Sequence, residues 1–188
     1  MAASAMRAQR GFTMIEVLVS LVIAVFGLLG LVGIQAFAHQ AELESYQRAQ
    51  ALVLLNDMAE RINANRQSAG CYSSSGMAYF GTDSGGAPAC ASGYLNTQTR
   101  LLANNDMLEW DLLLKGAAEK SGGNSVGAMV GARGCVTYDA ATQIYTVVVA
   151  WQGMTETFAP VVTCANGLYG SEPRRRAVWT TIRIATLS

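Results

Sequence analysis

The first helix of the chain is determined by residues 10–34, which read RGFTMIEVLVSLVIAVFGLLGLVGI. Glu16 is the one charged side chain between Phe12 and Gln35. A helix of about 20 apolar residues, rising ~1.5 Å per residue, crosses a bilayer, so this run is long enough to be a membrane span. An unpaired carboxylate inside such a span is costly, which makes Glu16 a candidate functional residue.

The residues around the apolar run predict its orientation. Arg7 and Arg10 precede the run, so the positive-inside rule keeps the N-terminus in the cytoplasm and places the C-terminal domain in the periplasm. A secretory signal would have a small-residue cleavage site after its apolar run, and residues 36–38, Ala-Phe-Ala, fit that pattern loosely. Cleavage at this second position and an uncleaved signal anchor are therefore two alternative interpretations.

The helix is predicted to continue beyond the membrane as an amphipathic stem. Residues 35–66 lack Pro and Gly, so we expect one helix over residues 12–66. Two acid-first pairs at a spacing of four add support, Glu44 with Arg48 and Asp57 with Arg61. The apolar stripe expected to pack on the protein's own sheet consists of Leu52, Leu55, Met58, Ala59 and Ile62.

The rest of the chain is predicted to form a small antiparallel sheet with a second helix. Residues 70–105 have the Ser, Gly and Pro content of a long loop, and a capping-box-like acid pair predicts that the second helix begins at Asp106. The tripeptide Arg174–Arg176 is interpreted as a solvated strand entry. Alternating apolar residues predict strands at residues 134–138, 144–152 and 177–185.

The cysteines point to an oxidising compartment. All four lie beyond the apolar run at wide spacing, which favours two disulfides over a zinc site. Three pairings are open, and nearest-neighbour pairing is our prediction: Cys71 with Cys90 and Cys135 with Cys164. The 13 basic and 13 acidic residues give zero formal charge, so no nucleic-acid partner is predicted. No enzyme, cofactor or metal motif is present in the sequence, and we predict no catalytic residue.

Residues 11–16, Gly-Phe-Thr-Met-Ile-Glu, resemble the class III signal of type IV prepilins. The match comprises the glycine, the bulky apolar residue after it, the glutamate four positions later and the uncharged run that follows. The resemblance implies that a prepilin peptidase cuts between Gly11 and Phe12 and methylates the new N-terminus at Phe12. It also implies that Glu16 is needed for assembly of the filament.

This resemblance and the patterns above give one predicted architecture. It is α+β, with a long N-terminal α-helix, half transmembrane and half amphipathic, packed on a small antiparallel β-sheet, as in pilins. The expected parts are a leader, a transmembrane and polymerisation helix, a stem helix and a periplasmic globular domain, at residues 1–11, 12–35, 36–69 and 70–188.

Features of the exported domain are similar to those of the minor pilins called type IV pilus modification proteins. These features are Asp106 and Trp110 in one helix, Cys135 at a strand, the strand 145–151, Cys164 and the arginine-rich last strand. The resemblance implies a minor pilin that primes pilus assembly at or near the filament tip and reaches the cell surface. Its implied partners are the inner membrane, the prepilin peptidase, other minor and major pilins and the pilus assembly machinery. A minor pseudopilin of a type II secretion system and a pilus-tip adhesin are the alternatives.

Overall fold

The computed structural model of the chain describes residues 11–73, 78–86, 89–90, 96–125 and 129–184. The chain divides into two compact units, residues 1–42 and residues 43–188. The order of elements confirms the α+β class. In chain order they are α1 (Met14–Ala64), η1 (Arg66–Ser68), α2 (Ala69–Ser73), β1 (Phe80–Gly81), α3 (Thr97–Leu114), β2 (Lys120–Ser121), β3 (Asn124–Ser125), β4 (Arg133–Asp139), β5 (Ile144–Gln152), η2 (Glu172–Arg174) and β6 (Arg175–Arg183).

Helix α1 is slightly shorter than the helix predicted for residues 12–66. Asn65 leaves the helical conformation, with φ of −106° and ψ of 45°. Its side-chain Nδ2 donates to the hydroxyl of Tyr72 at 3.2 Å and to the carbonyl of Thr99 at 2.8 Å. The amide is buried, so these two bonds satisfy a polar group at the end of the helix while the chain turns into η1 and α2.

The buried stripe of α1 in the second unit differs from the predicted stripe at one edge. Leu52 was predicted to be buried, but its exposed fraction is 42%. The reason is the rotation of about 100° per residue along a helix. Residues three, four and seven positions after Ala51 lie on the face toward the sheet, whereas Leu52 lies about 100° away from that face. The apolar residues buried on α1 are Ala51, Leu54, Leu55, Met58 and Ile62, with Ala59 partly buried against them.

The four-stranded sheet has the order β1-β4-β5-β6, and all its neighbours are antiparallel. The predicted antiparallel sheet is confirmed, and its strands β4 and β5 form a hairpin in which Val136 pairs with Val147 and Tyr138 with Tyr145. Strand β5 has the predicted bounds, whereas β6 begins two residues before the predicted strand. The predicted end of that last strand, Ala185, lies outside the described residues.

Helix α3 begins nine residues before the position predicted from the acid pair. Its N-cap is Asn96, whose side-chain oxygen accepts from the backbone N–H groups of Gln98 and Thr99. Asparagine is among the best N-cap residues because it satisfies amides that have no partner inside the helix. The segment predicted to be a loop therefore includes the first part of α3 as well as α2 and β1.

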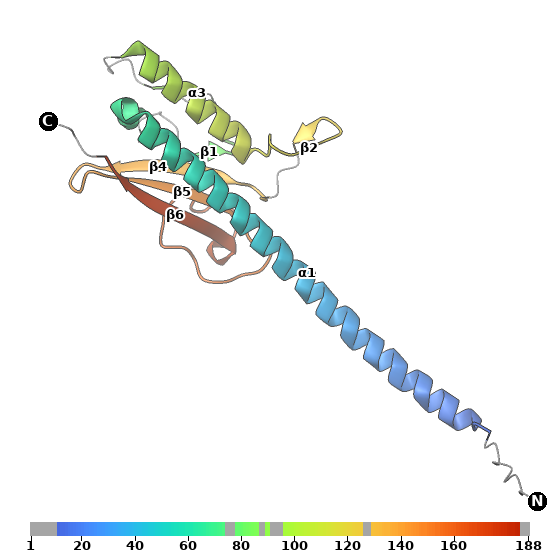
Figure 1. The fold of residues 1–188 in the computed structure, drawn as a ribbon. Helices are drawn as coiled ribbons and strands as arrows, with labels where there is room; N and C mark the ends of the chain where they lie inside the picture. Colours follow the sequence, from blue (N-terminus) through green and yellow to red (C-terminus); the bar gives the residue numbers. More distant parts are fainter. Residues whose placement is uncertain (1–10, 74–77, 87–88, 91–95, 126–128, 185–188) are drawn as a thin grey trace, which may run out of the picture. The chain divides into compact units, whose positions relative to one another are not determined.

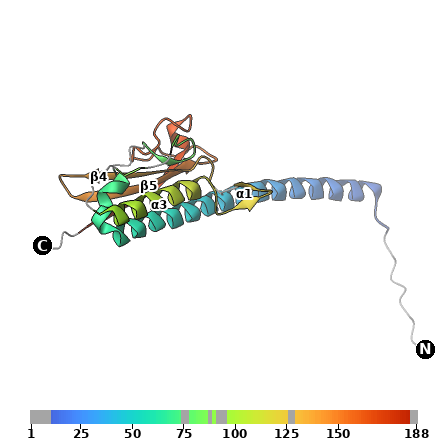
Figure 2. The same ribbon diagram turned by 90° about the horizontal axis from the view of Figure 1, so that it is seen from above.

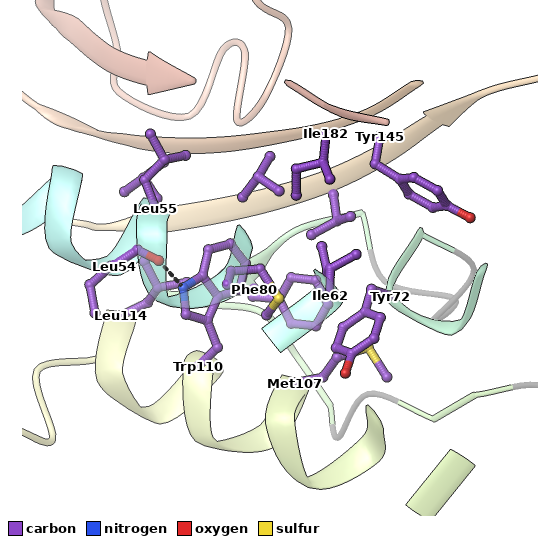
Figure 3. Packing of buried hydrophobic residues seen from close by; sticks show 14 of the residues in the cluster. Leu54, Leu55, Ile62, Tyr72, Phe80, Met107, Trp110, Leu114, Tyr145 and Ile182 are labelled. Atoms are coloured by element: carbon purple, nitrogen blue, oxygen red, sulfur yellow. Dashed lines mark hydrogen bonds between the residues drawn. The ribbon is translucent and has the colours of Figure 1, made fainter. Parts of the chain in front are cut away.

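Two helices cover one face of the sheet, and the main core lies between the layers (Figures 1 and 2). Trp110 of α3 is fully buried, and its Nε1 donates to the carbonyl of Leu54 on α1 at 2.8 Å (Figure 3). Its ring meets Phe80 edge to face, with 5.4 Å between ring centroids. One side chain thus joins α1, α3 and the sheet edge.

Both disulfides are present, as the nearest-neighbour pairs. Cys71–Cys90 ties α2 to the segment before α3 and encloses a sequence separation of 19 residues. Cys135–Cys164 joins β4 to the segment before η2 across 29 residues, and it belongs to a second, smaller apolar cluster with Val148 and Tyr169. Each bond contributes ~3 kcal/mol in the loop-entropy description. The two disulfides therefore fasten the connection between α2 and α3 and the connection between β5 and η2.

Gly134 on β4 gives a test of this packing. A Cβ at this position would overlap the ring of Trp110 and come within 2.8 Å of Leu114 Cδ1. We expect Gly134→Ala to lower the free energy of unfolding by ~1–3 kcal/mol through overpacking. Gly86→Ala is the control, because a Cβ there meets no atom within 4 Å. Urea unfolding of both variants tests this, and equal stabilities would contradict the packing described for Trp110.

Candidate functional site

The segment around Glu16 forms the start of α1. The backbone N–H of Glu16 donates to the carbonyl of Thr13 at 3.1 Å and faces the Thr13 hydroxyl at 3.4 Å. Thr13 therefore occupies the position of a capping residue, and Glu16 lies in the first helical turn, where a negative charge is favoured by the helix dipole. Among the described residues, no hydrogen bond or ion pair involves the Glu16 carboxylate.

Helix α1 is the one helix among the described residues that is long and apolar enough to cross a membrane. Every residue from Gly11 to His39 is exposed within the chain. Exposed side chains in this stretch include Phe26 at 70%, Ile34 at 69% and Phe37 at 74%. Water cannot cover so large an apolar surface at low free-energy cost, so this surface requires lipid or other apolar helices.

A charged cluster fixes the stem part of α1 to α3. Arg61 forms ion pairs with Asp57 at 2.9 Å, Asp106 at 3.0 Å and Glu109 at 2.8 Å. Tyr72 of α2 donates to Asp106 at 2.5 Å, and burial together with this bond raises the pKa of the Tyr72 hydroxyl well above its usual range. Asp106 is thus a structural anchor within α3 that joins three helices.

A buried carboxylate on α3 is also occupied by structural contacts. Asp111 is 2% exposed and accepts from the backbone N–H of Gly81 at 2.7 Å and from the Ser84 hydroxyl at 2.8 Å. Lys115 completes its environment, with Nζ at 2.6 Å from the carboxylate. In the part of the chain that the structure describes, no group of three or more His, Cys, Asp and Glu side chains has the arrangement of a metal site.

Two family models match this chain, and together they cover the segment around Glu16, all of α1 and most of α3. The model described as the prokaryotic N-terminal methylation motif matches residues 6–32. The model described as type IV pilin Tt1218 matches residues 33–111. The chain is a type IV pilin-like protein. The comparisons with curated proteins and with solved structures gave no match.

Family membership explains the two extreme features of this pilin-like protein, the exposed apolar helix and the single carboxylate within it. A pilin with a prepilin signal implies processing by a prepilin peptidase and association with other pilins and the pilus machinery. The apolar helix together with this signal indicates a membrane-anchored pilin. The pilin family is structural rather than enzymatic.

The arginine run of this pilin-like protein was interpreted as a solvated strand entry, and that interpretation is wrong for two of its three residues. Arg175 is 2% exposed and pairs with Glu172 at 2.7 Å. Arg176 is half-buried and pairs with Glu44 of α1 at 3.3 Å, so Glu44 is not paired with Arg48 as predicted. Only Arg174 is exposed. The charge of the run is evident in the sequence, but nothing in the sequence distinguishes the buried arginines from the exposed one.

The outer face of the sheet carries a groove of about 530 Å³. It lies on the face opposite α1, because the β5 residues that line it, Thr146 and Val148, alternate with the residues buried in the main core. Its other wall is formed by residues 161–166 and Leu168, which the Cys135–Cys164 bond holds against β4. The groove could not be predicted from the sequence, because the segment that covers it has neither a regular pattern nor a motif.

Proposed function

We propose that this protein is a minor pilin that promotes type IV pilus assembly, acting at or near the filament tip. The observation that supports the proposal is the juxtaposition of Gly11, Phe12 and Glu16 with an exposed apolar helix, the Glu16 carboxylate having no partner within the described part of the chain. A helix with these properties is suited to move from lipid into a bundle of like helices. The similarity to minor pilins of the modification type, stated above, favours the minor role over that of a bulk subunit.

Charge pairing supplies the mechanism of entry into the filament. Cleavage between Gly11 and Phe12 creates an α-amino group that stays cationic after methylation. When a subunit leaves the membrane, this amine neutralises Glu16 of a subunit already assembled, because a carboxylate in apolar surroundings is stable only with a partner. The pair then fixes the axial position of each subunit relative to the next. The C-terminal domain lies in the periplasm before assembly and at the cell surface afterwards.

The intact mass of the protein from host membranes tests this proposal. We expect the loss of residues 1–11 and the gain of one methyl group in cells that contain the prepilin peptidase. In peptidase-deficient cells we expect the full-length chain, which is the matched control. A chain that remains uncut in both strains, or a cut near Ala38, would contradict the proposal, because the apolar helix would then lack its new amine or be removed.

Deletion of the gene separates the proposed pilus role from a role in type II secretion. A minor pseudopilin is cut by the same peptidase, so the mass measurement alone leaves both systems open. Loss of surface pili with normal export of secreted proteins is the outcome expected here. Loss of export with normal pili would assign the chain to the secretion system instead.

A further inference from the structure

The loop of residues 153–163 presents an unusual apolar tip. Its residues 158–162 read Phe-Ala-Pro-Val-Val, without a polar side chain. Phe158 is 95% exposed and Val161 is 86% exposed, and Met154 at the start of the loop is 47% exposed. Pro160 and Val162 are partly buried, and Val162 packs against the second apolar cluster, so the exposed apolar surface of the tip comes from Phe158, Ala159 and Val161. Single exposed apolar residues are common on protein surfaces, but a group of them is usually covered by a partner.

The backbone of this loop is held in place from inside the domain. The buried guanidinium of Arg175 donates to the carbonyls of Val162 at 2.6 Å, Cys164 at 3.2 Å and Pro160 at 3.3 Å. The N–H of Thr157 donates to the carbonyl of Pro173 at 2.8 Å on the other side of the tip. A tip fixed in this way loses little conformational entropy on binding, so its apolar area is available for affinity.

The same loop is fastened to α1 at its other end. The Glu44 carboxylate accepts from the backbone N–H groups of Met154 at 3.2 Å and Thr155 at 3.4 Å, and it pairs with Arg176. On α1, Glu44 lies between Leu43 and Tyr46, whose exposed fractions are 51% and 48%. The anchored end of the loop is therefore fixed to α1 at a residue ten positions after Ile34, where the apolar run by which a pilin-like subunit is proposed to assemble comes to an end.

We propose that the loop 153–163 is a preformed contact for a neighbouring pilin-like subunit, with Phe158 as the anchor that enters an apolar site on that neighbour. This inference rests on the proposed function, because it takes its partner from the assembly that α1 mediates. Aromatic side chains surrounded by polar groups are the usual dominant contacts of protein interfaces. Here Glu156 and Arg174, an exposed pair at 3.6 Å, provide that polar rim.

Photo-crosslinking in host cells tests the contact directly. Benzoylphenylalanine replaces Phe158 in the full chain, and the control chain carries it at the exposed Ala140 in the β4–β5 turn. We expect Phe158-position adducts whose partner, identified by mass spectrometry, has a cleaved and methylated prepilin N-terminus, and no such adducts from position 140. Adducts with lipid alone would mean that the tip contacts the membrane, and that result, or the absence of adducts, would overturn the proposal.

A substitution provides an independent measurement. We expect Phe158→Ser to lower the amount of this chain in sheared pili about tenfold, as loss of an interface anchor does. The midpoint of thermal unfolding should stay unchanged, because the side chain is almost fully exposed. Wild-type amounts in pili would overturn the proposal. The N-terminal mass, measured in the same samples, separates the two hypotheses: an uncut chain contradicts the proposed function, whereas a processed chain without the Phe158 contact contradicts this inference alone.

Discussion

Replacement of Glu16 by Ala is expected to leave processing intact and to remove the protein from assembled pili. The cleavage site lies between Gly11 and Phe12, so the peptidase still has its glycine and the following apolar residue. The incoming amine, however, loses the carboxylate that neutralises it in apolar surroundings. Breaking a buried ion pair from one side costs ~3–5 kcal/mol, so we expect at least a tenfold fall in the amount of this chain in sheared pili.

Two further variants test whether charge is the reason. Glu16→Gln keeps the size of the side chain and one acceptor oxygen but not its charge, and it should fail as Ala does. Glu42→Ala is the matched control, because it removes an exposed carboxylate of the same helix, where Glu42 lies 3.4 Å from His39. Wild-type pili in Glu16→Gln, at normal protein levels, would contradict the ion-pair mechanism and leave a steric role for this side chain.

Periodicity predicted the regular elements of this fold well because burial acts on every turn of a helix and every second residue of a strand. The bounds of β5 and its antiparallel pairing with β4 follow from such repeats. The early start of α3 was missed because its first turns expose Leu101 and depend on the single N-cap Asn96. The acid at position 106, interpreted as a cap, is instead bound to Arg61 and Tyr72.

The candidate processing segment is a local motif that the sequence alone displays, whereas the contacts of the C-terminal domain depend on residues far apart in sequence. Glu44 and Arg176 form an ion pair across a sequence separation of 132 residues. Arg175 is buried because carbonyls of a distant loop converge on it, and a run of three arginines gives no indication of that. Trp179 is a large aromatic residue within a predicted strand, yet it is 48% exposed on β6. Such outcomes follow from tertiary structure, which local patterns do not encode.

Trp110→Ala is expected to be the most destabilising single substitution that these contacts predict. The indole is fully buried between α1 and α3, meets Phe80 and donates to the Leu54 carbonyl. Removing it leaves a large cavity, which costs ~3–5 kcal/mol of unfolding free energy, a large share of the total for a domain of this size. Urea unfolding of residues 43–188 measures the loss.

Matched tryptophan variants separate the sources of that loss. Trp110→Phe keeps much of the apolar volume and loses the donor to Leu54, so we expect a smaller decrease. Trp179→Ala removes a half-exposed ring and should change the stability by about 1 kcal/mol or less. Equal effects of Trp110→Ala and Trp179→Ala would contradict the described core. Trp110→Ala should also lower the amount of the protein in the membrane before assembly, whereas Glu16→Ala should lower only its amount in pili. The two variants therefore distinguish a pilin-like subunit that fails to fold from one that folds but cannot enter the filament.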